Sequence, residues 1–228
     1  MATFTVTTGT DVDDATDGET TLREAVRQAN DTTGVDRIAF DPALAGATIT
    51  LRTTGPQLRI TESVEIVGSG QTIAGGGQTR IFGLYGGPAT EISNLALTNG
   101  YRGAGTPGFG GAGLYIASGA GATLTDVALT DNDATFFSGG AIWNSGRLTL
   151  ESSTLSGNEA RSGGAIFNAG NLTLENTTLS GNSADRVGGG IENISGGSVT
   201  LTDSMLSNNS ADRDGGGVQN RGTLSLRS

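Results

Sequence analysis

Most of the chain alternates apolar and polar residues in short runs. In the C-terminal half, Leu148 and Leu150 enclose a threonine, and Leu172 and Leu174 do the same one repeat later. Alternation with a period of two residues predicts a strand with one buried face. Threonine and serine fill the positions between the leucines, and threonine in particular is favoured on strand surfaces. Short strands are therefore the main element that the pattern predicts.

One segment near the N-terminus has helical spacing instead. Residues 21–30 read TLREAVRQAN. The apolar positions, which recur at intervals of three and four residues, are Leu22, Ala25, Val26 and Ala29. This spacing predicts an amphipathic helix of about three turns. Residues 4–8, FTVTT, alternate as a strand before it, and we expect the helix to cap the end of the strand structure that follows.

The C-terminal half repeats one phrase at steps of 24 to 27 residues. Residues 139–158 read GGAIWNSGRLTLESSTLSGN, residues 163–182 read GGAIFNAGNLTLENTTLSGN, and residues 188–209 read GGGIENISGGSVTLTDSMLSNN. One asparagine column contains Asn132, Asn158, Asn182 and Asn209, and a second contains Asn144, Asn168, Asn193 and Asn220. A fixed period of this length indicates a repeat architecture.

Each repeat contains three short strands separated by glycine, asparagine or serine turns, so each predicts one coil of a right-handed parallel β-helix. Successive coils would lie about 4.8 Å apart. Extra residues in the third copy, at Val187 and within 194–198, fall at predicted turns. The expected fold is all-β and a single domain over residues 1–228, in which 1–36 form the N-terminal strand and capping helix, 37–110 form irregular coils, and 111–228 form regular repeats, truncated or open at the C-terminus.

Glycine pairs and the asparagine columns mark the corners of the predicted coils. Gly139-Gly140 and Gly163-Gly164 stand where the backbone must turn sharply with positive φ. The asparagines would also lie at corners, because asparagine tolerates the left-handed region and its amide can hydrogen-bond to the next coil. We interpret both columns as structural ladders rather than catalytic groups.

The order of the motifs resembles one bacterial family. TLREAV at 21–26 is followed by DRIAFDPALAGATITL at 36–51, by LRITESVEIVGSG at 58–70, and then by the GGAI and LSGN repeats. This order is similar to the bacterial extracellular right-handed β-helix family whose N-terminal motif reads Cys-Ser-Leu-Arg-Glu-Ala, with repeats like those of polymorphic outer-membrane proteins. Thr20-Thr21 replace the Cys-Ser of the motif, and Leu155 and Leu179 stand where the outer-membrane repeats have phenylalanine.

The resemblance implies a location and a role. Members are mostly secreted or surface proteins that serve as stalks or as passengers of adhesin-like polypeptides, so it implies a non-catalytic module that contacts a glycan or a surface protein. Residues 1–20 lack a basic start followed by an apolar stretch. Similar chains that begin Met-Ala-Thr-Phe-Thr-Val look like type I secretion substrates. The expected location is therefore extracellular or at the bacterial cell surface, without an N-terminal signal.

Composition removes several classes of function. The sequence has no cysteine and no histidine, which excludes disulfides, Cys/His metal sites and histidine-based catalysis. All 13 basic residues are arginine, and 23 acidic residues give a net charge of −10. Such an acidic chain is a poor partner for nucleic acid. No apolar run approaches the roughly 18 residues of a membrane span.

An acidic loop before the predicted helix is a candidate calcium site. Asp13, Asp17 and Glu24 match positions 1, 5 and 12 of a calcium-loop pattern. Ala15 stands at position 3 and removes one ligand. The alternative is a solvated acidic loop before a capped helix. No cofactor is required by the sequence, and Ca²⁺ is the one candidate ion.

Three aromatic residues share one column of the repeats. Tyr115, Trp143 and Phe167 each follow a buried aliphatic residue, so alternation predicts that they face outward. A flat aromatic strip on the side of a solenoid is a candidate platform for a sugar or a protein partner. The alternative is a stacking ladder beneath a loop, because the column ends in Glu192 and Gln219.

Two further possibilities stay open. A carbohydrate-active lyase or hydrolase is the alternative function, and Asp131 with Asp133 or Asp212 with Asp214 are the carboxylate pairs that could serve it. The last residues, after Leu224 and Leu226, stop within a coil. An open coil exposes strand edges, so the chain could also associate with itself end to end.

Overall fold

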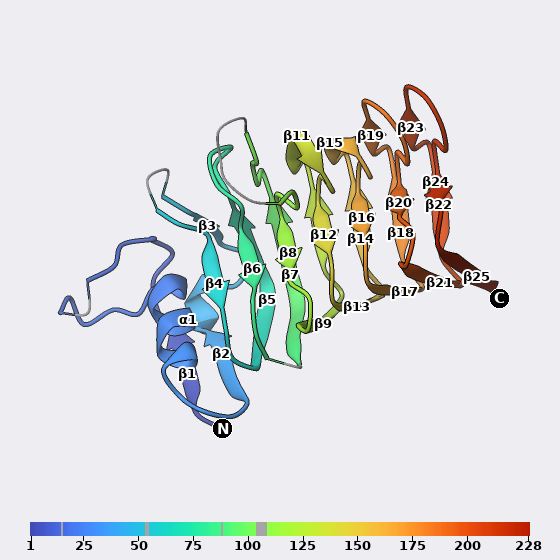
Figure 1. The fold of residues 1–228 in the computed structure, drawn as a ribbon. Helices are drawn as coiled ribbons and strands as arrows, with labels where there is room; N and C mark the ends of the chain where they lie inside the picture. The colour runs from blue at the N-terminus through green and yellow to red at the C-terminus, as the bar shows by residue number, and fades with distance from the viewer. Residues whose placement is uncertain (15, 53–54, 88, 104–108) are drawn as a thin grey trace.

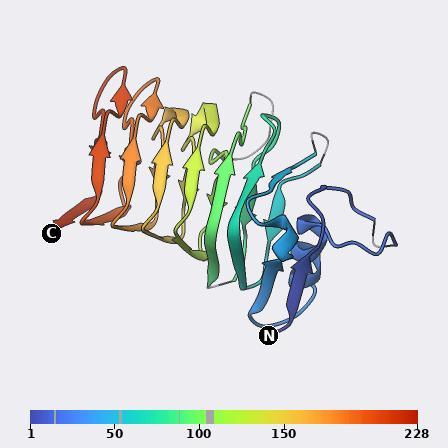
Figure 2. The same cartoon turned by 180° about the vertical axis from the view of Figure 1, so that it is seen from behind.

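The alternating strands wind into successive coils that stack along one axis (Figure 1). This computed structural model describes residues 1–14, 16–52, 55–87, 89–103 and 109–228. The two termini lie at opposite ends of the stack, and the view from behind shows the same row of coils (Figure 2). Neighbouring strands pair in parallel along the row, for example β8 (Leu114–Ile116) with β12 (Ile142–Asn144). The predicted parallel β-helix is thereby confirmed.

One sheet takes a single strand from each of seven coils. In spatial order its strands are β24 (Val218–Asn220), β20 (Ile191–Asn193), β16 (Ile166–Asn168), β12, β8, β6 (Phe82–Leu84) and β4 (Leu58–Ile60). Ile142 pairs with Ile166, which pairs in turn with Ile191, and all three are fully buried. This is the interior aliphatic stack that the repeat predicts.

A 14-stranded sheet forms the second and largest wall. Its strands are β1 (Thr3–Val6), β2 (Asp36–Phe40), β3 (Thr48–Thr50), β5 (Val64–Ala74), β7 (Thr90–Thr98), β9 (Gly121–Thr125), β10 (Ala128–Thr130), β13 (Arg147–Glu151), β14 (Thr154–Ser156), β17 (Asn171–Glu175), β18 (Thr178–Ser180), β21 (Ser198–Thr202), β22 (Met205–Ser207) and β25 (Thr223–Arg227). The long β7 pairs with both β9 and β10. In later coils this wall therefore consists of two short strands with a turn between them.

A small four-stranded sheet closes the third side of the coils. It contains β11 (Asp133–Ser138), β15 (Glu159–Ser162), β19 (Ser183–Ala184) and β23 (Ser210–Ala211). β11 has six residues where β15 has four, so the register shifts between Ala134 and Ser138. Two extra residues in one strand of a pair form a bulge, which turns side chains out of the regular pattern.

The helix α1 (Leu22–Asn30) lies at the N-terminal end of the stack (Figure 1), and a short 3₁₀ helix, η1 (Pro42–Leu44), precedes β3. A capping box starts α1: the Thr21 hydroxyl accepts from the Glu24 N–H at 3.2 Å, and the Glu24 carboxylate accepts from the Thr21 N–H at 2.9 Å. Its apolar face is buried as predicted, at Leu22, Ala25, Val26 and Ala29. The helix therefore covers the first coil.

The first glycine of each corner pair has the predicted positive φ, but the second glycine and the ladder asparagines do not. Gly139 and Gly163 have φ values of 72° and 61°. A Cβ on the next residue, Gly140, would lie 2.1 Å from the Gly164 carbonyl oxygen. Left-handed φ falls on the residues just before one asparagine column, at Asp131, Gly157, Gly181 and Asn208. The expectation of left-handed asparagines is therefore wrong, because the preceding residue makes the turn and frees the asparagine to point inward.

Candidate functional site

Two ladders of asparagine amides, buried except at their last members Asn209 and Asn220, run along the axis at the corners of the regular coils. In the first, the Asn144 Nδ2 donates to the Asn168 Oδ1 at 2.8 Å, and Asn168 donates in the same way to Asn193 at 2.8 Å. Asn193 continues the ladder to Asn220 at 2.7 Å. Asn168 and Asn193 thus each accept from the coil before and donate to the coil after.

The second ladder follows the same rule at another corner. Asn132 donates to Asn158 at 3.0 Å, Asn158 to Asn182 at 2.9 Å, and Asn182 to Asn209 at 2.8 Å. The other hydrogen of the Asn158 amide goes to the Leu129 carbonyl at 2.9 Å. Because these amides are fully used and Asn132, Asn158 and Asn182 are completely buried, they hold coils together rather than bind a ligand.

The predicted aromatic strip is assembled but is not open. Register places Trp143 between Tyr115 and Phe167, and all three point away from the aliphatic core. Tyr115 is only 7% exposed and Phe167 only 8%, while Trp143 is partly buried. The expectation of an exposed strip is therefore wrong. Alternation fixes the direction of a side chain, but other side chains can still cover it.

Phe109, which the sequence pattern did not single out, supplies part of this cover. Its ring lies parallel to that of Tyr115 with 5.6 Å between centroids, and 5.1 Å from that of Trp143. The Trp143 and Phe167 rings stack at 4.0 Å. The result is a continuous aromatic row along the outside of the coils.

Arg80 fixes the backbone beside Phe109. Its guanidinium donates to the carbonyls of Gly111 at 2.8 Å and Gly110 at 2.6 Å, and also to that of Phe109. It lies 4.8 Å from the ring centroid of Tyr115, within the range of a cation–π contact. Burial lowers the pKa of Arg80 to about 10, so it remains charged near neutral pH. A buried cation surrounded by carbonyls anchors the segment that carries Phe109.

The bulge in β11 carries two more phenylalanines. Phe136 is 55% exposed, and Phe137 packs on the small alanine cluster of Ala112, Ala134 and Ala160. The Arg102 guanidinium lies 5.6 Å from the Phe137 ring centroid. Comparison of repeat lengths could have found these residues, because this coil is two residues longer than the next.

Glu192 continues the aromatic column on the far side of Phe167. It pairs in register with Phe167 and is only 7% exposed. Burial raises the pKa of Glu192, and the positive charge of Arg221 and a hydrogen bond with Ser162 act in the opposite direction. It is a buried carboxylate outside the main core, with one basic residue acting on it.

The acidic residues of the proposed calcium loop already have protein partners. Asp13 forms an ion pair with Arg27, and its other oxygen lies 3.8 Å from Arg52. The Glu24 carboxylate accepts from the backbone N–H groups of Thr21 and Asp14.

The third candidate ligand is also engaged locally. The Asp17 carboxylate accepts from the Glu19 N–H at 2.8 Å. Ala15 lies outside the described residues. In the described ranges, this loop included, no group of three His, Cys, Asp or Glu side chains is arranged to hold a metal. The calcium site stays a prediction.

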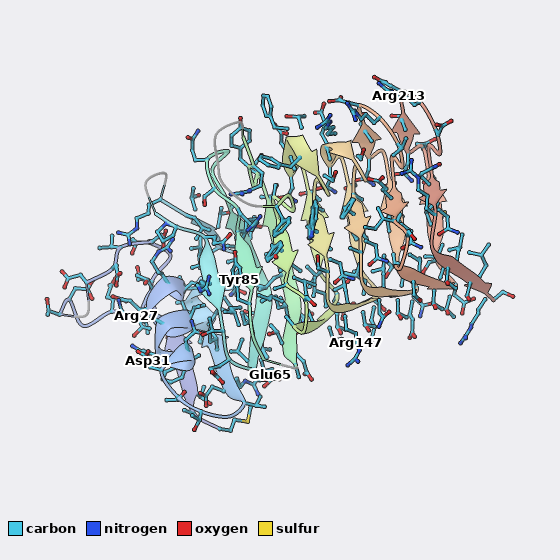
Figure 3. The ribbon with its side chains drawn as sticks, viewed as in Figure 1. Arg27, Asp31, Glu65, Tyr85, Arg147 and Arg213 are labelled. Carbon is cyan, nitrogen blue, oxygen red and sulfur yellow. The ribbon has the colours of Figure 1, made fainter. Side chains whose placement is uncertain are left out.

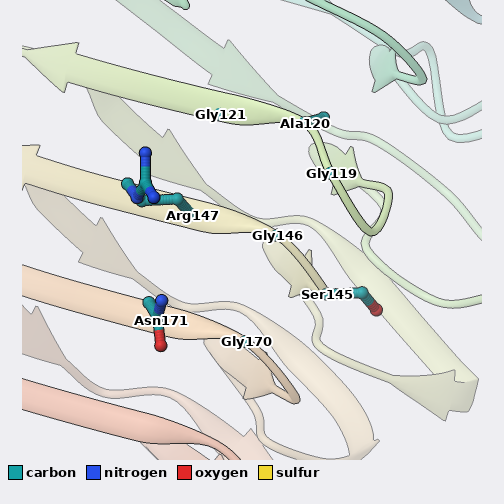
Figure 4. Close-up of a pocket in the computed structure, with 8 residues that line it drawn as sticks. All are labelled: Gly119, Ala120, Gly121, Ser145, Gly146, Arg147, Gly170 and Asn171. Atoms are coloured by element: carbon teal, nitrogen blue, oxygen red, sulfur yellow. The ribbon is translucent and has the colours of Figure 1, made fainter. Parts of the chain in front are cut away.

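A groove of about 280 Å³ lies at the corner between two walls (Figure 4). Its lining is mainly backbone, at Gly119, Ala120, Gly121, Gly146 and Gly170, with the side chains of Ser145, Arg147 and Asn171. Arg147 is exposed at the edge of the molecule (Figure 3). The groove has a single charged group and no carboxylate, so it does not provide an acid–base pair.

Comparison with known proteins gives one match. A family model described as the right handed beta helix region matches residues 83–226, which is well over half of the chain. No curated protein and no solved structure gave a significant match. Within the part of the chain that the structure describes, no helix is long and apolar enough to cross a membrane.

Proposed function

We propose that this chain, which belongs to the right-handed β-helix family, is a rigid, non-catalytic module of an extracellular or cell-surface protein. In this role it acts as a stalk, or as the passenger of an adhesin-like polypeptide that contacts a glycan or a surface protein. The order of its motifs supports the proposal, because it resembles that of bacterial extracellular β-helix proteins with Leu-Arg-Glu-Ala motifs and outer-membrane-type repeats.

The observation that carries the proposal is the pair of continuous amide ladders. In a solenoid, each coil contacts only its neighbours, so stiffness along the axis depends on the bonds between successive coils. Here backbone pairing is reinforced by side-chain amides at two corners of the coils from Asn144 onward, for example from Asn158 to Asn182. A solenoid that is stiffened in this way is suited to act as a spacer or a scaffold.

The location is tested on intact cells of the source organism. Antibody labelling and mild external proteolysis should detect the chain at the cell surface or in the medium. The comparison is a cytoplasmic marker protein in the same cells. Recovery of the chain only with the cytoplasmic marker would contradict the proposed location.

The alternative, a carbohydrate-active enzyme, is tested with a panel of polysaccharides in lyase and hydrolase assays. We expect no turnover. Among the candidate carboxylates, Asp133 begins strand β11 and caps it by accepting from the Thr135 N–H at 2.8 Å. Turnover that is abolished by Asp212→Ala or Asp214→Ala would replace the structural role by an enzymatic one.

Self-association is the remaining partner proposal. The buried face of α1 covers the first coil, so another copy that docked there end to end would have to displace the helix. Light scattering at rising protein concentration measures this. A mass that grows without limit would indicate head-to-tail filaments, whereas we expect the mass to reach a plateau.

A further inference from the structure

Four aromatic side chains form one patch on the outer surface, which we call the aromatic patch: Phe109, Phe136, Phe137 and Trp143. They come from two successive coils that are joined by the Gly111 N–H and the Ser138 carbonyl at 3.2 Å. Arg102 links them further, since it lies over the Phe137 ring and donates to the Phe109 carbonyl at 3.2 Å. Phe109, Phe137 and Trp143 are thereby linked, and Phe136 precedes Phe137 in the same bulge.

The patch is exposed where a regular coil would be polar. Phe109 is 54% exposed and Phe136 is 55% exposed. Along the described chain, the next exposed large apolar side chain after Phe136 is Met205. The bulge brings Phe136 to the surface without serving the core, because Phe137 alone packs inward. A local irregularity that exposes an aromatic ring points to a binding role.

We propose that the aromatic patch binds a neutral hexose chain. The inference rests on the proposed function, because it names the partner class of a non-catalytic surface module. A pyranose ring has an apolar C–H face and a polar hydroxyl edge. The exposed rings suit the face, and the guanidinium of Arg102, which lies over the Phe137 ring, suits the edge.

Size and charge favour this ligand over two others. A stable protein interface buries about 800 Å² on each partner around a fully buried apolar centre. Two half-exposed phenylalanines surrounded by serine, threonine and glycine offer much less apolar surface than such an interface needs. An acidic glycan would approach a chain with a net charge of −10, so long-range repulsion opposes it.

The sequence supplies its own reporter for the test. Trp143 is the single tryptophan and contacts Phe109 within the patch. We would titrate the full chain with cellohexaose, laminarihexaose and maltohexaose, and with hexagalacturonate as the acidic comparison. Tryptophan emission and calorimetry give the affinity, and mass spectrometry of the recovered sugar shows whether it stays intact.

We expect saturable binding of at least one neutral hexaose and none of hexagalacturonate. Phe136→Ala should weaken binding about tenfold, and Phe136→Tyr should restore it, because the ring and not its hydrophobicity alone makes the contact. Met205→Ala is the matched control, since Met205 is also exposed, at 56%, and lies outside the patch. Melting temperatures establish that each variant is folded.

The outcomes separate the inference from the proposed function. No response to any neutral hexaose, equal affinity in Phe136→Ala, or oligomers of the chain that Phe136→Ala dissolves would each overturn the sugar site and leave the rigid module standing. Shortened sugar products would overturn the non-catalytic role, while the site itself would be retained.

Discussion

The hydroxyl of Thr90 is buried without a hydrogen-bond partner among the described residues. A buried polar group that makes no bond costs free energy in the folded state. Thr90→Val replaces the hydroxyl by a methyl group of similar size. We expect it to stabilise the protein by about 1 kcal/mol. Urea unfolding monitored by circular dichroism measures the change.

Thr177→Val is the matched control for Thr90. Thr177 is equally buried, but its hydroxyl lies 2.9 Å from the Glu175 carbonyl oxygen, to which it donates. Removing that bond should destabilise the protein by about 1–2 kcal/mol. If both valine variants lower the free energy of unfolding, the hydroxyl of Thr90 has a partner after all.

The buried carboxyl group of Glu192 predicts that the stability of the protein depends on pH. Because burial raises its pKa, the folded state holds the proton more tightly than the unfolded chain. The stability that this group contributes is full below the ordinary carboxyl pKa, about 4.3, and is lost as pH rises through the folded pKa. Glu192→Gln should therefore stabilise the protein at pH 7 and have little effect near pH 4.

The measurement is the melting temperature of both proteins across that pH range. Glu19→Gln, at an exposed position in the loop before α1, is the comparison. The Glu192→Gln curve should separate from the wild-type curve as pH rises. Curves that stay parallel from pH 4 to pH 7 would show that the carboxyl of Glu192 titrates as it does in water.

At the scale of the elements, the amide ladders predict which asparagines matter. Asn168 accepts from Asn144 and donates to Asn193, both at 2.8 Å. Asn168→Ala removes these bonds and leaves one hydrogen-bonding position unfilled on each of the buried amides of Asn144 and Asn193, which keep their other partners. We expect a loss of about 2–4 kcal/mol in the free energy of unfolding.

The control for the ladder is Asn171→Ala. Asn171 lies three residues along the same coil, but its side chain is exposed. We expect a change within about 0.5 kcal/mol, as for most surface substitutions. Urea unfolding measures the free energy of unfolding of both variants. Equal decreases in the two variants would mean that the ladder adds no stability beyond that of backbone pairing.

The repeat explains why so much of the coil architecture is predictable. The same kind of residue recurs at each strand position in several repeats. Ile142, Ile166 and Ile191 therefore identify one interior stack, even though each strand has only three residues. The helix is equally predictable from the sequence, because its capping box and its apolar spacing involve residues that are close together in the chain. Information that is repeated or local can be read along the chain.

The cover of the aromatic column could not be predicted in the same way. Tyr115 faces outward by alternation, yet the ring that stacks on it belongs to Phe109, in a less regular segment. Its anchor, Arg80, lies almost 30 residues earlier in the sequence. A contact between two irregular segments occurs at one place in the chain and is not repeated from coil to coil. The alternation of residues therefore predicts the direction of the Tyr115 ring but not its burial.

The acidic loop and helix α1 predict no response of the melting temperature to calcium. Asp13 is neutralised by Arg27, and Glu24 serves the capping box. A cation would have to displace both arrangements. We therefore expect no shift in melting temperature on adding millimolar CaCl₂ at constant ionic strength. A rise that Asp13→Ala abolishes would establish the site predicted from Asp13, Asp17 and Glu24.

For the whole molecule, the arrangement of charge predicts how stability depends on salt. Parallel stacking places identical positions of successive coils side by side, so Glu151 lies beside Glu175 and Asp133 beside Glu159. Like charges on neighbouring strands are unfavourable. The four ion pairs among the described residues oppose this, and three of them are partly exposed, so each contributes little. With a net charge of −10, repulsion dominates.

Added salt should therefore stabilise the protein, in contrast to a protein held by surface ion pairs. Raising the ionic strength from about 0.01 M to about 1 M with NaCl shortens the screening length from about 30 Å to about 3 Å, below the distance between adjacent strands. The melting temperature should rise over this range, and it should rise less in Glu175→Gln, which removes one member of a stacked pair. A melting temperature that falls with salt would mean that the arginine ion pairs, and not the stacked carboxylates, control the electrostatic stability of the solenoid.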